Sequence, residues 1–126
     1  MKTLVFIMLT LSVSFSECKQ LSDGTKDQTK MDFEIKVHER FKIKLESNPT
    51  TGYQWKWSNK QDISIVDSTN WRYVADFPVR TGSGGKEIWT FEGIKTGIDT
   101  IKMEYYRSWE KNVPSAESKT FIVQVR

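Results

Sequence analysis

A catalytic or metal centre in this chain would have to use His38 or Cys18, the single histidine and the single cysteine. Ser-His-Asp and Cys-His centres need a histidine beside the nucleophile. His38 lies in the segment KVHER, where alternation directs it to solvent beside Lys36. One histidine and one cysteine are also too few for an ordinary zinc or copper site. The sequence therefore predicts a protein that is not an enzyme and that binds no metal or other cofactor.

One stretch, TGSGGKE at 81–87, partly resembles a phosphate-binding loop. The pattern G-x-x-x-x-G-K-[ST] requires glycine where the chain has Arg80 and serine or threonine where it has Glu87. The following sequence is also strand-like, whereas a phosphate loop leads into a helix. These glycines must therefore serve a different purpose.

Three loops contain residues that a simple change of chain direction does not require. NPTTG (48–52) has the usual turn residues, but it also places Thr50 and Thr51 at its tip. The second loop is FPVRTGSGGK (77–86), and the third is RSWEKNVPSAES (107–118). Because loops on a rigid scaffold often carry binding sites, these segments predict a binding protein.

The segments between these loops alternate apolar and polar residues. The alternating sets lie at 33–37, 41–45, 53–57, 63–66, 71–73, 89–91, 101–105 and 121–125. A period of two places each set on one face of a strand, so we expect Trp55, Trp57, Trp89 and Phe91 in the core. Such regular spacing is typical of an all-β sandwich or barrel. The pattern predicts one antiparallel all-β domain, and counting strand directions places the three loops at the same end.

The amino-terminal residues have the layout of a secretory signal peptide. A basic start precedes an apolar stretch at 4–13, which is too short to span a bilayer, and small residues follow at Ser14 and Ser16. Cleavage after residue 16 fits this pattern, and cleavage as late as Cys18 is the alternative. The signal predicts entry into the secretory pathway, followed by secretion or delivery to a lysosome- or phagosome-type compartment.

The expected organisation is therefore a signal peptide at 1–16, a flexible polar segment at 17–30 and one folded domain at 31–126. Because Cys18 is the sole cysteine, no internal disulfide can form. The formal net charge of +3 and the pI of about 9.0 predict only mild attraction to acidic surfaces. No run of basic residues indicates a nucleic-acid arm.

Taken in order, NPTTGY (48–53), GSGG (82–85) and Arg107-Ser108-Trp109 resemble the loops of the chagasin family. Members of that family are protein inhibitors of papain-like cysteine peptidases. The likeness extends from about residue 30 to Arg126. The resemblance implies a chagasin-like inhibitor domain at 31–126, with the fold of an immunoglobulin-like antiparallel β-sandwich without a disulfide.

The resemblance also implies which residues bind the peptidase. The first loop would enter the cleft, with Thr50 and Thr51 over the catalytic cysteine. The glycine-rich loop would lie along one side of the cleft, and Trp109 with Arg107 would pack on the other. The implied contact residues are Asn48, Pro49, Thr50, Thr51, Gly52, Gly82, Ser83, Gly84, Gly85, Arg107 and Trp109. One departure is Ser108, where the family usually has proline.

The predicted function is reversible, tight-binding inhibition of papain-like cysteine peptidases of cathepsin L type. We expect a monomer with no nucleic-acid partner and no membrane partner after removal of the signal. One alternative is a secreted immunoglobulin-like adhesion or carbohydrate-binding module that does not need the NPTTG tip. Another is a β domain that binds polyanions or single-stranded nucleic acid, although most of its aromatic residues fall on the predicted core face.

Overall fold

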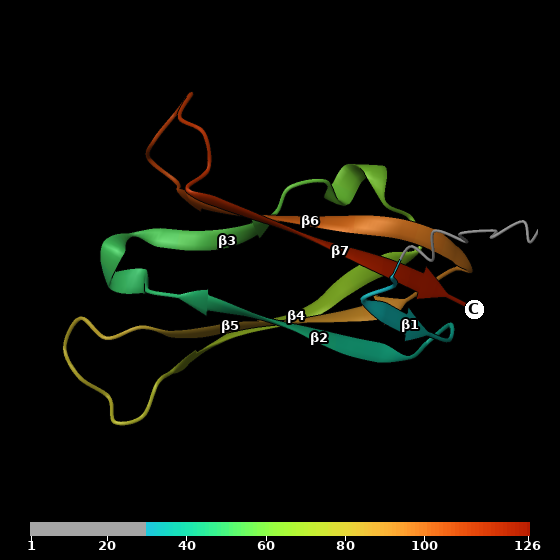
Figure 1. Ribbon diagram of the computed structural model, residues 1–126, viewed down its shortest axis with the longest axis horizontal. Helices are drawn as coiled ribbons and strands as arrows, with labels where there is room; N and C mark the ends of the chain where they lie inside the picture. The colour runs from blue at the N-terminus through green and yellow to red at the C-terminus, as the bar shows by residue number, and fades with distance from the viewer. Residues whose placement is uncertain (1–29) are drawn as a thin grey trace, which may run out of the picture.

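The computed structural model describes residues 30–126, which form two stacked β-sheets (Figure 1). The predicted signal peptide, Cys18 and the polar segment up to residue 29 lie outside the described residues. The strands are β1 (Phe33–Ile35), β2 (Arg40–Ser47), β3 (Tyr53–Trp57), β4 (Val66–Ala75), β5 (Gly85–Gly93), β6 (Gly97–Arg107) and β7 (Glu117–Val125). Two 3-10 turns, η1 (Pro49–Thr51) and η2 (Lys60–Asp62), are the helical segments of this part of the chain.

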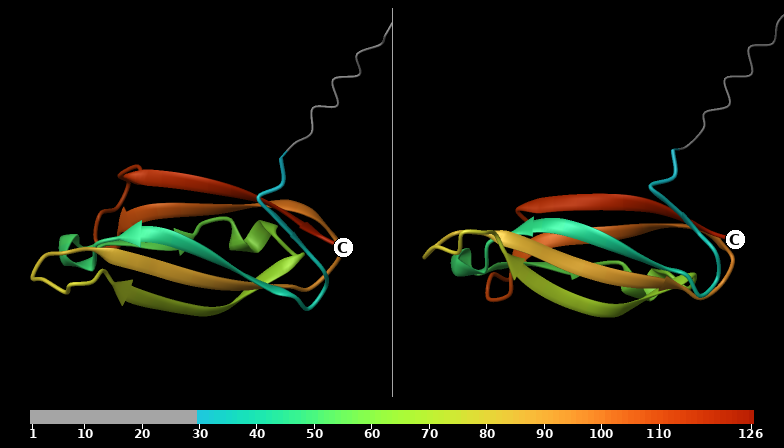
Figure 2. Two further views of the ribbon diagram at one scale, coloured as in Figure 1. Left: turned by 60° about the horizontal axis from the view of Figure 1, so that its bottom comes forward. Right: turned by 90° about the horizontal axis from the view of Figure 1, so that it is seen from below.

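The two sheets have the strand orders β1-β7-β6-β3 and β2-β5-β4, and Figure 2 shows them as separate layers. This architecture confirms the predicted all-β sandwich. One pair departs from the antiparallel pattern, because β1 runs parallel to β7 with Phe33 opposite Val123. The chain turns between β1 and β2 at the end of the sandwich opposite the three loops, so β1 runs in the direction of β7.

His38 is exposed, as predicted, but it is not a strand residue. It lies in the turn between β1 and β2 with a φ of 72°, and its N–H donates to the carbonyl of Gly93 at 2.8 Å. The strand ends at Ile35, so the predicted strand register of His38 was wrong. Histidine is one of the residue types that are enriched at positive φ.

The core lies between the sheets and is rich in aromatic rings. Phe91 is 0% exposed; its ring centroid lies 5.5 Å from that of Phe41 and 5.1 Å from that of Trp57. Trp55 is buried, and Trp57 and Trp89 are partly buried against the same cluster, as predicted. Full burial of one such side chain stabilises the fold by about 1.5–3 kcal/mol.

A β-bulge in β4 decides which way two aromatic residues face. Ser68 pairs with Phe91 and Asn70 pairs with the adjacent Thr90, so Thr69 is an extra residue. The insertion reverses the alternation and places Trp71 opposite Trp89. Because β4 is an edge strand, Trp71 remains 51% exposed, unlike the core tryptophans.

Glu87 in β5 is a buried carboxylate that joins both sheets. It is 2% exposed. Its Oε2 accepts hydrogen bonds from Ser47 Oγ at 2.7 Å and Trp55 N at 3.1 Å, and its Oε1 accepts one from Trp71 Nε1 at 2.8 Å. A buried polar group without such partners is strongly destabilising. The carboxylate thus holds β2, β3 and β4 in a defined position around β5.

We expect Glu87→Gln to lower the free energy of unfolding by about 2–3 kcal/mol, because its amide NH₂ would face N–H and O–H donors. Urea titration followed by circular dichroism measures this change. Glu92→Gln is the matched control in the same strand. Glu92 lies half-buried on the outer face of the sheet, 4.0 Å from Arg40, and its loss should change stability by less than about 0.5 kcal/mol. Equal stabilities of the two variants would contradict the assigned role of Glu87.

Candidate functional site

The three loops singled out from the sequence lie together at one end of the sandwich (Figure 1). They are the β2–β3 loop at 48–52, the β4–β5 loop at 76–84 and the β6–β7 loop at 108–116. The β2–β3 loop lies between the other two, and the carboxyl terminus lies at the opposite end. The clustering predicted from strand directions is therefore confirmed.

The β2–β3 loop is a single closed 3-10 turn. Asn48 caps it from an extended conformation, and its Oδ1 accepts a hydrogen bond from Thr50 N at 3.2 Å. Gly52 ends the turn with a φ of 81°, and its N–H donates to the carbonyl of Pro49 at 3.0 Å. Proline at the first position and glycine in the left-handed conformation both fit this geometry. The result is a narrow, well-supported tip with no buried residue.

Both threonine hydroxyls at this tip donate their protons inside the loop. Thr50 Oγ1 donates to Asn48 Oδ1, and Thr51 Oγ1 donates to the Asn48 carbonyl at 2.6 Å. Amide and carbonyl oxygens accept but do not donate, so the direction of both bonds is fixed. The outward lone pairs of the hydroxyls therefore present hydrogen-bond acceptors at the tip.

Asn48 also connects this tip to the glycine-rich loop. Its Nδ2 donates to the carbonyl of Gly82 at 3.1 Å. A Cβ on Gly84 would lie 3.1 Å from the Ser47 carbonyl oxygen, so the two loops approach each other closely. Gly82 is exposed and Ser83 is half-buried, with Ser83 Oγ donating to the Arg80 carbonyl at 2.7 Å.

Gly85 has a different place from the rest of the predicted contact set. It is the first residue of β5 and is buried, and a Cβ there would lie 2.2 Å from the carbonyl oxygen of Val74. The absence of a side chain lets β4 and β5 pack at the base of the hairpin, so Gly85 lies beneath the surface that the exposed members of the predicted contact set form. The glycine pattern by itself does not distinguish an exposed glycine from a buried one.

The same hairpin base is held by a charged cluster. Lys86 Nζ lies 3.3 Å from Asp76 Oδ1 and 3.5 Å from Glu46 Oε1. The hydrogen bond and charge of Asp76, with a smaller contribution from Glu46, raise the pKa of Lys86 above its ordinary value. The ammonium therefore stays charged through the neutral range and links β2 to both sides of the hairpin.

Arg107 connects the central tip to the third loop. Its Nε donates to the Thr51 carbonyl at 3.1 Å, and its Nη1 pairs with Glu110 at 3.1 Å. The guanidinium carbon lies 4.2 Å from the centroid of the Tyr53 ring, a cation–π distance. Arg107 therefore acts chiefly as a brace between loops.

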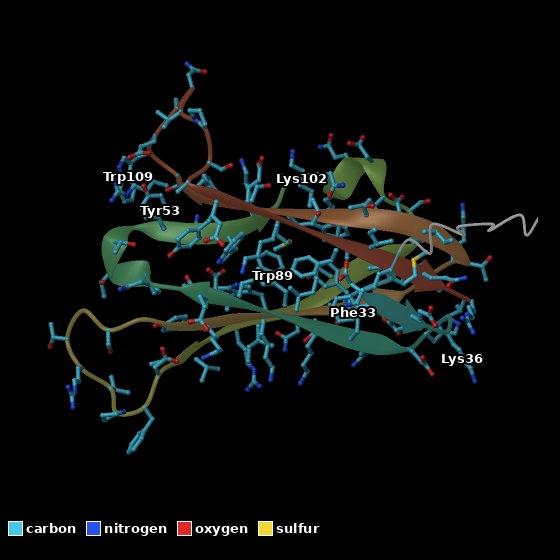
Figure 3. The ribbon with its side chains drawn as sticks, in the orientation of Figure 1. Phe33, Lys36, Tyr53, Trp89, Lys102 and Trp109 are labelled. Carbon is cyan, nitrogen blue, oxygen red and sulfur yellow. The ribbon has the colours of Figure 1, made fainter. Side chains whose placement is uncertain are left out.

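Trp109 is an exposed residue at the edge of the tip and not a core tryptophan. Its side chain is 64% exposed and its ring covers Gly52, where a Cβ would lie 1.9 Å from Cη2 of the indole. Figure 3 shows Trp109 beside Tyr53 at the loop end, far from the labelled Trp89 in the core. The structure therefore places Trp109 at the surface.

Sequence reasoning missed several residues that belong to this end. Tyr105 accepts a hydrogen bond from Asn48 N at 2.9 Å, and its ring stacks between those of Tyr53 and Trp55. Phe77 and Val79, in the glycine-rich loop, are 96% and 73% exposed. The signal for Phe77 and Val79 was their apolar character within a loop, whereas nothing in the sequence separated Tyr105 from an ordinary core tyrosine.

Residues 30–126 contain no group of three histidine, cysteine, aspartate or glutamate side chains that could hold a metal ion. Across these same residues, no helix has the length and apolar character needed to cross a membrane.

Comparison with known proteins identifies the relatives of this chain. The family model described as "Chagasin family peptidase inhibitor I42" matches residues 34–125. Amoebiasin-2 of Entamoeba histolytica is 29% identical over 131 residues, with 100% of each chain covered. Chagasin of Trypanosoma cruzi is 29% identical over 98 residues, covering 73% of this chain and 84% of Chagasin. The crystal structure of the cysteine protease inhibitor EhICP2 from Entamoeba histolytica superposes with a TM-score of 0.61 at 25% identity, covering 75% of this chain and 97% of that one.

Two glycines with nearly the same φ test the contact between Trp109 and the tip. We expect Gly52→Ala to displace the indole of Trp109, since the new methyl group would occupy its position. Gly82→Ala is the control, because Gly82 has a φ of 78° and no atom lies within 4 Å of a Cβ added there. Each variant meets the left-handed backbone penalty of about 1–2 kcal/mol. The indole N–H resonance of Trp109 in a ¹⁵N correlation spectrum should shift in the first variant alone, and a shift in neither would contradict this packing.

Proposed function

Since this chain belongs to the chagasin family of peptidase inhibitors, we propose that it blocks papain-like cysteine peptidases reversibly, by laying its three loops across the active-site cleft. The family consists of protein inhibitors and not of enzymes, and the named relatives include a cysteine protease inhibitor. The observation that carries the proposal is the direct connection of all three loops. Asn48 bonds to Gly82 on one side, and Arg107 bonds to Thr51 on the other, so the loop end is one continuous surface.

The central tip has the shape that a narrow cleft requires. It projects no side chain larger than threonine or proline, and it needs little ordering because Asn48, Gly52 and Tyr105 already hold it. A contact surface that is organised before binding loses less conformational entropy when the complex forms. This favours tight binding without a covalent bond.

The same geometry explains how such a tip would resist cleavage. A peptidase cuts a chain whose scissile bond lies in line with its nucleophile. In the tip, Thr51 N donates to the Asn48 carbonyl at 3.1 Å and Gly52 N to the Pro49 carbonyl at 3.0 Å. These bonds keep the backbone in a tight turn, so no extended peptide bond is offered to the thiolate.

The polarity of the tip complements the catalytic pair of the target. The reactive form of a papain-like centre is a thiolate beside a protonated imidazole. Because the hydroxyl protons of Thr50 and Thr51 are used within the loop, their oxygens can accept from an imidazolium N–H. An acceptor surface matches that donor and forms no competing bond with the thiolate.

Exposed apolar side chains flank the tip on both sides. Trp109 lies on the side of the third loop, and Phe77 and Val79 lie on the glycine-rich loop. Large, rigid aromatic residues commonly supply most of the binding energy at protein interfaces. We propose that these side chains contact the walls of the peptidase cleft, on either side of the peptidase's catalytic residues.

We further propose that the chain acts as a monomer on peptidases of cathepsin L type. Its amino-terminal pattern supports entry into the secretory pathway, with secretion or a lysosome- or phagosome-type compartment as its destination. In each of these compartments, the protein could encounter papain-like peptidases.

Inhibition kinetics with papain and a cathepsin L-like enzyme test the proposal. We expect Thr51→Asp and Trp109→Ala each to raise the inhibition constant at least tenfold, which corresponds to about 1.4 kcal/mol. The aspartate would place a second negative charge beside the thiolate, and the alanine would remove an apolar anchor. Thr120→Asp, at an exposed site in β7, adds the same charge away from the loops and should leave inhibition unchanged.

If the unmodified protein fails to inhibit at micromolar concentration, the proposed function is wrong. The alternative of a secreted adhesion or carbohydrate-binding module would then be favoured, provided that its binding survives Thr51→Asp. Inhibition that is unchanged in both loop variants would instead show that a different surface contacts the peptidase.

The departure from the family pattern at Ser108 gives a second test. Ser108→Pro should lower the inhibition constant about two- to fivefold, because proline removes about 0.4–1 kcal/mol of ordering cost from the loop that carries Trp109. Ser115→Pro, farther along the same loop, is the comparison. Weaker inhibition by Ser108→Pro would show that the backbone at this position does not fit the proline conformation.

A further inference from the structure

The outer face of the β2-β5-β4 sheet carries a group of cationic side chains that lie outside the three loops at the end of the sandwich. In β2, Arg40, Lys42 and Lys44 alternate with the buried core residues, so they share the outer face. Lys44 and Arg72 lie in one row across the sheet, on either side of Ile88. Figure 3 shows nitrogen-tipped side chains projecting from this sheet away from the other layer.

Three of these cations have no carboxylate partner among the described residues. Arg40 pairs with Glu92 at 4.0 Å, whereas Lys42, Lys44 and Arg72 form no ion pair within residues 30–126. Strand geometry separates Lys42 from Lys44 by about 7 Å and Lys44 from Arg72 by about 10 Å. The charges of Lys42, Lys44 and Arg72 are therefore unpaired among the described residues and regularly spaced, whereas Arg40 and Lys86 on the same face are paired with Glu92 and Glu46.

A basin lies between these side chains. It has a volume of about 600 Å³ and is lined by Arg40, Lys42, Thr69, Asn70, Arg72 and Thr90. Three of the lining residues, Thr69, Asn70 and Thr90, are small and polar, and Thr90 lies between Lys42 and Asn70 in one row across the three strands. The basin thus combines cationic walls with hydroxyl and amide groups that can hydrogen-bond a neutral polar ligand group.

We propose that this face binds a linear sulfated polysaccharide. Sulfate groups repeated along a chain match the row of cations in β2, and sugar hydroxyls match the threonine and asparagine groups of the basin. Single-stranded nucleic acid fits less well, because it needs aromatic side chains for base stacking. The aromatic residues of β4 and β5, among them Trp71 and Trp89, lie on the inner-facing positions of this sheet.

The proposed site lies on the flank of the sandwich, whereas the inhibitory loops lie at its end (Figure 1). A polysaccharide chain and a peptidase could therefore occupy the protein together. The proposal does not depend on the proposed inhibitory function, and either can fail without the other.

Binding to immobilised heparin at 50 and 150 mM sodium chloride tests the proposal. We expect the unmodified chain to bind, with an affinity that falls steeply as salt rises. The triple variant Lys42→Gln, Lys44→Gln and Arg72→Gln should bind at least tenfold more weakly at 50 mM. Thermal unfolding and peptidase inhibition, both measured on the same preparation, should match the unmodified chain.

The matched control removes the same total charge from other exposed positions, through Lys56→Gln, Lys95→Gln and Lys102→Gln. It should weaken heparin binding less than threefold. Equal losses in the two triple variants would overturn the assigned site, and so would an absence of heparin binding by the unmodified chain at 50 mM. If single-stranded DNA bound as tightly as heparin, the choice of a sulfated polysaccharide would be wrong.

Discussion

The arrangement of the loop end depends on one buried carboxylate. Glu87 lies in the central strand of its sheet and accepts hydrogen bonds from Ser47, Trp55 and Trp71. These donors belong to the three strands β2, β3 and β4, of which β3 is in the other sheet. A charged group in this place is tolerated only while its acceptors are satisfied. The separation of the two sheets beneath the loops is thereby fixed by specific bonds and not by apolar packing alone.

The central loop takes its position directly from this arrangement. Ser47 is both a partner of Glu87 and the last residue of β2, so the next residue, Asn48, starts the loop from a fixed point. Asn48 then bonds to Tyr105 below it and to Gly82 beside it. The tip is thus held in a fixed position by hydrogen bonds that run from the core carboxylate through Ser47 to Asn48 and its partners.

Much of the architecture followed from alternation. The strict pattern of β2 predicted its buried and exposed faces, and strand parity predicted that the loops meet. Alternation places Glu87 on the same face as Trp89 and Phe91, but a glutamate is normally a surface residue, so its burial is explained only by the three donors that the structure reveals. The burial of Gly85 was hidden for a similar reason, since a glycine carries no side-chain signal of its environment. The proposed contact residues come from the family pattern, whereas the residues that support them, such as Tyr105, depend on tertiary packing.

The bulge at Thr69 makes β4 unusual in its response to changes of length. Deleting the extra residue would remove the bulge, but Asn70 and Trp71 would keep their partners Thr90 and Trp89. Trp71 would therefore stay on the inner face beside Glu87, and Arg72 would stay on the outer face. Closing the bulge with Thr69 still in the ladder would instead move Trp71 to the outer face, opposite Ile88, and place Arg72 opposite Glu87 in the interior. In a comparison of homologous sequences, a gap opposite Thr69 would thus indicate a regular strand with the same two faces, whereas a strand of full length depends on the bulge to keep Trp71 inside.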